Sequence, residues 1–124
     1  MGGRHAKQKG KRGEAEARDD FKPAYPGCER VEPGGSIDRR GIDLHSTGSL
    51  RVQVKRNAKY CSVRKIEEVQ CLENEIPVLW TRGDRQKAIV CLYAEDFVKI
   101  LTDIGVAYDQ DSNTYKRNQA EPVH

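Results

Sequence analysis

The stretch 41-GIDLHSTGSLRVQVKR-56 decides the fold, because a short loop joins two strand-like runs within it. Side chains alternate between the two faces of a strand, so the second run places apolar residues on one face and polar ones on the other. The polar face carries Arg51, Gln53 and Lys55. If residues 47–49 form a three-residue hairpin loop, Asp43 lies opposite Gln53, with Cβ atoms about 4.5–5.5 Å apart. We therefore expect a hairpin with one buried face and one polar face.

The pattern around this hairpin predicts the order helix, three strands, helix, two strands, helix. The expected helices cover residues 10–22, 63–75 and 94–104, and the expected strands outside the hairpin cover residues 28–33, 78–81 and 87–93. Ser62 is a candidate N-cap for the second helix, and Trp80 is expected in the core. A strand-helix-strand crossover after a meander predicts an α/β fold with a mixed central sheet flanked by helices.

The length of 124 residues suits a single domain. We expect this domain to span residues 10–108, preceded by a flexible basic segment at 1–9 and followed by a polar tail at 109–124. No run is long and apolar enough to cross a bilayer, and the start of the chain lacks the apolar segment of a signal peptide. These features predict a soluble, cytoplasmic protein without membrane association.

The four cysteines lie far apart in the sequence and form no CxxC pair. They are Cys28, Cys61, Cys71 and Cys91. Structural zinc sites usually bring their ligands in close pairs, which argues against such a site. We expect free, mostly buried thiols in a reducing cytoplasm.

Basic residues gather in three groups, although the net charge is only +3. The residues expected to contact DNA are Arg4, Lys7, Lys9, Lys11, Arg12, Arg39, Arg40, Arg56 and Lys59. Such groups attract phosphates and release counterions from nucleic acid. The alternative for the first group is a solvated, solubilising leader.

The polar face of the hairpin combines an acid, an amide oxygen and a lysine, an arrangement that can hold a hard cation beside a phosphate. Mg²⁺ takes oxygen ligands at about 2.0–2.1 Å in octahedral geometry. Asp43 would supply a carboxylate, Gln53 its amide oxygen and Val54 its backbone carbonyl. Lys55 would stabilise charge on the phosphate or help to activate the attacking water.

One carboxylate gives such a site little negative charge, and Glu14 or Glu16 of the first predicted helix can reinforce it. They point in different directions because they lie two residues apart on a helix. Each residue also has a purely structural interpretation. Asp43 can end a strand, and alternation alone produces a solvated strand face. Asp38 is an alternative to Asp43, but it lies in a loop.

The run Asp43-x9-Gln53-x-Lys55 resembles the core motif of the PD-(D/E)xK nuclease superfamily. The predicted order of elements is similar to the restriction-endonuclease-like αβββαβ core of that superfamily. Glutamine at the second position departs from the usual acid and is similar to the Mrr-like restriction nucleases. The resemblance spans roughly residues 9–101.

Two upstream segments resemble the archaeal and phage Holliday junction resolvases. In those proteins a Lys-Gly pair is followed by three residues and then by a metal-binding glutamate. The segment 9-KGKRGEAE-16 repeats this spacing, which implies a role at the metal for Glu14, with Glu16 as the alternative. The loop 33-PGGSID-38 is similar to a serine loop near the scissile strand, which implies a role for Ser36.

The resemblance implies a metal-dependent DNA endonuclease, most closely a Holliday junction resolvase that acts as a homodimer with Mg²⁺, or Mn²⁺ as a substitute. It also implies a prokaryotic, viral or phage source. A four-way junction has near two-fold symmetry, to which a two-fold dimer presents two active sites. The alternatives are an Mrr-like restriction or repair endonuclease on duplex DNA, and a non-catalytic nucleic-acid-binding protein in which Gln53 reflects a lost site.

Overall fold

The computed structural model describes residues 3–56, 62–103, 106–109 and 114–117, with side chains described at 11–56 and 62–103. The chain forms two compact units, Met1–Leu92 and Tyr93–His124. The division falls inside the range 10–108, which the sequence predicts as one domain. The described helices include none that is long and apolar enough to cross a membrane.

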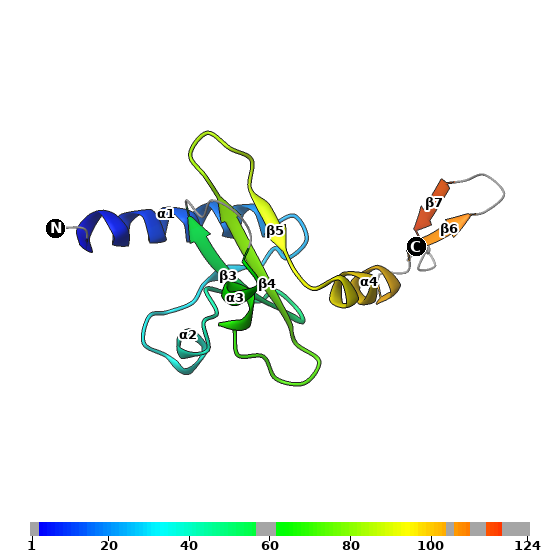
Figure 1. Cartoon of the computed structure of the whole chain (residues 1–124), viewed down its shortest axis with the longest axis horizontal. Coiled ribbons are helices and arrows are strands. Elements are labelled where there is room, and N and C mark those ends of the chain that lie inside the picture. Colours follow the sequence, from blue (N-terminus) through cyan, green and yellow to red (C-terminus); the bar gives the residue numbers. More distant parts are fainter. Residues whose placement is uncertain (1–2, 57–61, 104–105, 110–113, 118–124) are drawn as a thin grey trace. The chain divides into compact units, whose positions relative to one another are not determined.

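The first unit has a mixed sheet with helices on both sides (Figure 1). Its elements are α1 (Gly3–Phe21), β1 (Glu29–Arg30), α2 (Ser36–Arg39), β2 (Leu44–His45), β3 (Leu50–Arg56), α3 (Val63–Glu67), β4 (Ile76–Arg82) and β5 (Ile89–Cys91). β3 and β4 are parallel, β5 is antiparallel to β4, and β1 is antiparallel to β2. A parallel pair needs a long crossover, which the segment containing α3 supplies. The α/β class and the mixed sheet are confirmed.

The second unit contains α4 (Ala94–Asp103), β6 (Val106–Asp109) and β7 (Thr114–Arg117). Glu95 and Asp96 lie in the first turn of α4, where negative charge favours a helix. β6 and β7 pair antiparallel, with Tyr108 beside Tyr115. The prediction of a frayed tail from residue 109 is therefore wrong for 114–117, where residues with strand propensity outweigh the polar composition.

β3 is covered on both faces by neighbouring helices. On the face of Val54, α1 lies so close that a Cβ placed on Gly13 would be 3.3 Å from Val54 Cγ1. On the opposite face, Gln53 Nε2 donates to Glu68 Oε2 at 3.1 Å, just beyond α3. Gln53 is only 5% exposed as a result. The solvated strand face, which the sequence offers as the purely structural alternative, is therefore not found at Gln53, although β3 is an end strand of the β3-β4-β5 sheet.

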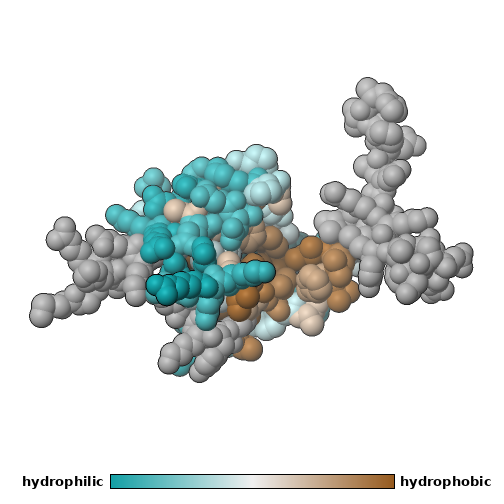
Figure 2. Space-filling model, turned by 90° about the horizontal axis from the view of Figure 1, so that it is seen from above, coloured by the Kyte–Doolittle hydropathy of each residue, from teal (hydrophilic) through white to brown (hydrophobic). Residues whose placement is uncertain are grey.

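The core confirms the prediction for Trp80, which is 1% exposed. Its Nε1 donates to Asp20 Oδ2 at 2.8 Å and thereby joins β4 to α1. The other buried apolar residues are Ala17, Cys28, Ile42, Leu44, Val52, Val54, Ile66, Val69, Ile76, Val78 and Leu79. Some apolar surface stays open (brown in Figure 2), and Ile89 and Val90 of β5 are exposed.

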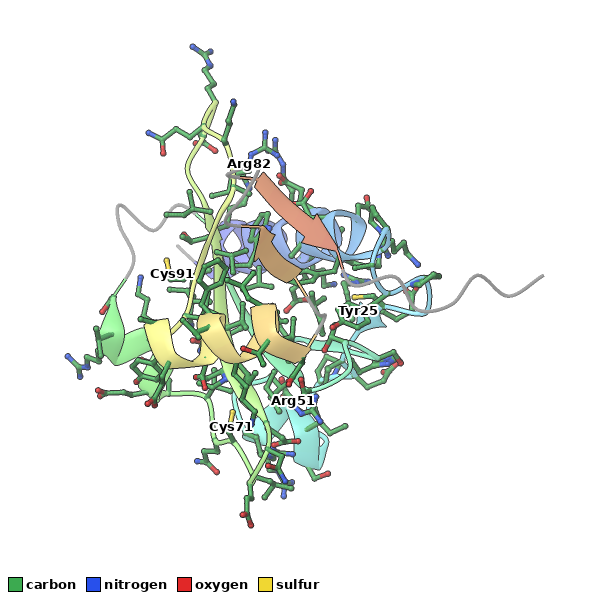
Figure 3. The ribbon with its side chains drawn as sticks, turned by 90° about the vertical axis from the view of Figure 1, so that its right-hand side faces the viewer. Tyr25, Arg51, Cys71, Arg82 and Cys91 are labelled. Atoms are coloured by element: carbon green, nitrogen blue, oxygen red, sulfur yellow. The ribbon has the colours of Figure 1, made fainter. Side chains whose placement is uncertain are left out.

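Two clusters of arginine and glutamate brace opposite ends of β3 and β4. At one end Glu75 accepts hydrogen bonds from Arg40 and from Arg51. At the other end Glu16 pairs with Arg56 and Arg82. Figure 3 shows Arg51 and Arg82 at the two ends of the sheet. These clusters connect elements that lie far apart in the chain.

Two helices differ in length from the prediction. α1 begins at Gly3, so most of segment 1–9 is helical rather than loose, and its residues include good helix formers. α3 ends at Glu67 instead of residue 75. It stops early because the N–H of Gln70 turns away to bond the Arg40 carbonyl at 2.8 Å. Ser62 is the N-cap residue of α3, as predicted.

The cysteines do not all behave as the sequence predicts. Cys28 is a free, buried thiol, and burial raises its pKa. Cys91 is disulfide-bonded, so the prediction of free thiols is wrong at that position.

Candidate functional site

Asp43 lies at the edge of β3, just before β2. Its N–H donates to the Val52 carbonyl at 2.8 Å, and its carboxylate Oδ2 accepts from the Val54 N–H at 2.7 Å. Its carbonyl accepts from the Val31 N–H at 2.9 Å. The loop predicted at 47–49 is confirmed as a turn, in which the Leu50 N–H donates to the Thr47 carbonyl. β2 pairs with β1 rather than with β3, so the predicted hairpin is not formed as a two-stranded ladder. The bonds of Asp43 to Val52 and Val54 still place it beside the part of β3 that the prediction sets opposite it.

The backbone of Val54 faces the same edge. The N–H and C=O of one strand residue point to the same side of the strand. Since the Val54 N–H reaches the Asp43 carboxylate, the Val54 carbonyl is directed to the edge where Asp43 lies. The predicted carbonyl ligand and the predicted carboxylate ligand thus share one side of β3.

The carboxylate of Asp43 is half-buried, and its pKa is raised. Burial is the main cause, and the negative charge of Asp38 adds to it. The Val54 N–H and the positive charge of Lys55 act in the opposite direction without cancelling these effects. The structure therefore places Lys55 within electrostatic reach of Asp43, as the motif predicts.

Glu14 belongs to the same acidic group. Burial raises its pKa, and the charges of Asp43 and Asp38 raise it further, whereas Arg30 and Lys11 act to lower it. The helix brings this carboxylate to the sheet because Gly13, the preceding residue, has no side chain to hold α1 away from β3. The site thus holds carboxylates that repel one another.

Glu16 has a different environment, although it lies two residues from Glu14. Its carboxylate accepts from Arg56 Nε at 2.9 Å, pairs with Arg82, and lies 3.3 Å from Arg12 Nε. These ion pairs occupy it within the fold. The charge of Asp43 acts on Glu14, whereas Glu16, the alternative, is engaged by arginines.

The amide nitrogen of Gln53 is bound by an acid that the hairpin does not predict. Within the described part of the chain its hydrogen-bond partner is Glu68 and not Asp43. Its Oε1 is buried and has no hydrogen-bond partner among the described residues. Glu68 is not identified from the sequence, because it belongs to no motif and lies 15 residues after Gln53.

The loop before β2 contributes an acid to the group. Ser36 is exposed and begins α2. Asp38 accepts from the Gly34 N–H at 2.8 Å and acts electrostatically on both Glu14 and Asp43. Asp38, which the sequence offers as an alternative to Asp43, thus accompanies it.

Two of the arginines predicted to bind DNA are used inside the fold. Arg40 donates to the Gln70 carbonyl at 2.9 Å and pairs with Glu75. The side chain of Arg56 is only 4% exposed and pairs with Glu16. Both guanidinium groups are held by carboxylates in the fold, so a DNA contact at either position stays a prediction that would have to compete with these ion pairs.

Other predicted DNA contacts remain open to solvent or lie outside the described residues. Lys11, Arg12 and Arg39 are exposed. The side chains of Arg4, Lys7 and Lys9 lie outside the described set, as does the whole of Lys59.

A groove of about 960 Å³ opens beside Glu14. Lys11 and Arg30 lie on its walls, together with Arg18 and His45. Arg30 and His45 belong to no motif. The signal that could have found Arg30 is the pairing of β1 with β2, which sets it opposite Leu44, next to Asp43. Glu29 and Glu32 also line the groove, so its walls carry both acidic and basic side chains.

No known family, curated protein or solved structure matches the chain. No three His, Cys, Asp or Glu side chains of the described residues are arranged to hold a metal ion. The donors at the edge of β3 form a different kind of set, with two carboxylates, a carbonyl and a nearby amide oxygen. These are the oxygen donors that Mg²⁺ takes. Burial is the main cause of the raised pKa values of both carboxylates, and the charge of Asp38 adds to it in each case.

Proposed function

We propose that the chain is a metal-dependent, structure-selective DNA endonuclease, most closely a Holliday junction resolvase. One observation carries the proposal: the Asp43 carboxylate is fixed by the Val54 N–H at 2.7 Å, the charges of Asp38 and Lys55 act on it, and its own charge acts on Glu14. A fold gains nothing from acids that repel one another, and such groups cluster at functional sites.

The carboxylates of Asp43 and Glu14 repel one another, and a divalent cation bound between the oxygen donors would relieve this repulsion. Asp43 and Glu14 would hold the ion, with the Val54 carbonyl and the Gln53 amide oxygen as further ligands. A bound Mg²⁺ supplies Lewis acidity toward a phosphate. Mn²⁺, which accepts similar oxygen ligands, is a suitable substitute.

Each side chain around this set has a role in hydrolysis of a phosphodiester. Lys55 stabilises negative charge that develops on the phosphate. The Val54 N–H holds the Asp43 carboxylate in one orientation, so that little reorganisation is needed. Lys11 and Arg30, on the wall of the groove, hold the DNA backbone.

Preference for a four-way junction is supported by the resemblance of segments 9–16 and 33–38 to the resolvases. A homodimer would present two equivalent sites to the two strands that must be cut. The same chemistry would serve an enzyme that cuts duplex DNA, because the fold does not determine the substrate.

The test is cleavage of a labelled four-way junction and of a linear duplex of the same sequence, with and without Mg²⁺. We expect Mg²⁺-dependent cutting of the junction in preference to the duplex. Asp43→Asn should lower the rate by about 1,000-fold, equivalent to ~4 kcal/mol of transition-state stabilisation, while DNA binding is kept.

Asp19→Asn is the matched control, since Asp19 is an exposed aspartate on α1. It should cut at the wild-type rate. Equal cutting of junction and duplex would favour the duplex nuclease, and binding without cutting would favour the non-catalytic protein. Full activity of Asp43→Asn in saturating Mg²⁺ would exclude the proposed site.

A further inference from the structure

The amide of Gln53 is held in one orientation by Glu68. Gln53 Nε2 donates to Glu68 Oε2 at 3.1 Å. A carboxylate can only accept hydrogen bonds, so Glu68 binds the NH₂ group of the amide and turns Oε1 away from itself. The direction of the amide oxygen is thus decided by an acid on a different element.

This oxygen is buried without a partner. Gln53 is 5% exposed, and its Oε1 has no hydrogen-bond partner in the part of the chain that is described. Buried polar atoms are rarely left so, and an orphaned acceptor often marks a missing ligand. A cation is one species that an acceptor oxygen can bind.

Gln53 is close to the acidic group along β3. It precedes Val54, whose N–H binds the Asp43 carboxylate, and it shares a strand face with Lys55. From this juxtaposition we propose that Glu68 is a positioning residue, which fixes Gln53 so that its amide oxygen completes the divalent-cation site at Asp43. The inference rests on the proposed function and names a further residue of that site.

Glu68 also supplies the charge that the neutral amide lacks. A carboxylate that accepts from the NH₂ group of an amide draws positive charge to the nitrogen and leaves the oxygen more negative, as partners of ligand side chains do in other metal sites. Glu68 thereby supplies the negative charge, and Gln53 supplies the oxygen that binds the cation.

The early end of α3 places Glu68 where this is possible. Glu68 is the C-cap residue of α3. Its carbonyl lies so close to Gly41 that a Cβ placed there would be 3.0 Å away. Gly41 has φ +79°, which favours glycine. The backbone of Glu68 is therefore fixed against the loop that leads to Asp43.

The test measures Mn²⁺ binding to the full chain without DNA, by loss of the electron paramagnetic resonance signal of free Mn²⁺. Glu68→Gln should weaken the Kd about 10-fold, the lower end of the range for residues that position metal ligands. Glu67→Gln, a change at the neighbouring exposed glutamate of α3, is the matched control and should bind as the wild type does.

The swap Gln53→Glu with Glu68→Gln returns an acid and an amide to the pair and should restore the affinity to within about threefold of wild type. It also keeps the proposal testable if Glu68→Gln does not fold, since a swapped protein that binds Mn²⁺ 10-fold more weakly would overturn it. A purely structural role for Glu68 predicts a lower Tm of the metal-free protein with an unchanged Kd.

The same titration separates this inference from the proposed function. Wild-type affinity in Glu68→Gln, together with Mg²⁺-dependent cutting by the wild-type protein, overturns the inference alone. Mn²⁺ binding that depends on both Asp43 and Glu68, without cutting of any DNA, overturns the proposed function alone. A wild-type chain that neither binds Mn²⁺ nor cuts DNA overturns both.

Discussion

Glu14 and Glu16 lie two residues apart on α1, yet their surroundings are opposite. Glu16 lies among arginines, with Arg56 Nε at 2.9 Å. The pKa of Glu14 is raised by burial and by the charges of Asp43 and Asp38, although Arg30 and Lys11 act to lower it. One carboxylate stabilises the fold, whereas the other is held in a position that the fold alone does not favour.

The difference arises from the direction of each side chain around the helix. Residues two apart on a helix do not share a face, so Glu16 reaches the end of β3 and β4 while Glu14 reaches the edge near β2. Carboxylates with ion partners are typical of structural clusters, and carboxylates that repel one another are typical of sites that bind or react. The comparison can be tested by changing each acid separately.

The largest effect is expected from Glu16→Ala. It leaves the guanidinium of Arg56, which is 4% exposed, without its main carboxylate partner. Loss of one partner of a buried ion pair costs about 3–5 kcal/mol. Urea unfolding followed by circular dichroism should show this loss, whereas Glu14→Ala should change the stability by less than about 1 kcal/mol. Equal losses in the two variants would contradict the comparison.

The next prediction concerns the rate of cutting, on which Glu14 should have the larger effect and Glu16 the smaller. Glu14→Gln should lower the rate of Mg²⁺-dependent cutting about 100-fold, or ~2.7 kcal/mol, because it removes a charged ligand and keeps the side-chain shape. Glu16→Gln should keep the wild-type rate per folded molecule. The measurement is single-turnover cleavage of a four-way junction. A similar fall in rate for both variants would mean that Glu14 acts only through the fold.

These contrasts explain how much of the site is predictable from sequence. Asp43 and Lys55 follow from the alternation of a single hairpin, which is a local pattern. The roles of Arg56 and Glu16 depend on a contact across 40 residues of chain, which no local pattern contains. The burial of Gln53 likewise depends on α3, whose early end is set by the bond between the Gln70 N–H and the Arg40 carbonyl.

A smaller effect is expected on the free energy of unfolding when Asp43 is replaced. Asp43→Asn removes a charge whose burial raises the pKa and keeps an oxygen for the Val54 N–H. It should stabilise the metal-free protein by roughly 0.5–2 kcal/mol at pH 7, as changes at functional sites often do. Thermal unfolding measures the gain, and Asp19→Asn should show none.

The sign of the pH dependence follows from the raised pKa of Asp43. The native state holds the proton of this carboxyl more tightly than the unfolded state does, so its contribution is complete below the ordinary aspartate pKa of 3.8 and is lost as the pH rises through the raised value. The stability difference between Asp43→Asn and wild type should therefore grow with rising pH. A difference that shrinks would exclude burial as the cause.

The smallest effect concerns DNA binding beside Glu14. Lys11→Ala should make the slope of log affinity against log salt shallower by about 0.9, the value for one phosphate contact on duplex DNA. Lys87, an exposed lysine outside the groove, provides the matched control. Binding is measured at several salt concentrations with metal omitted. An unchanged slope for Lys11→Ala would place the DNA elsewhere.

The hydrogen bond between Trp80 and Asp20 gives the protein a built-in optical probe. Trp80 is the only tryptophan of the chain, and its indole is buried between β4 and α1. Its fluorescence therefore reports whether α1, the helix that carries both contrasted glutamates, remains on the sheet. A red shift of the emission would mark the release of α1, so displacement of this helix can be distinguished from chemistry at the acids without attaching a dye.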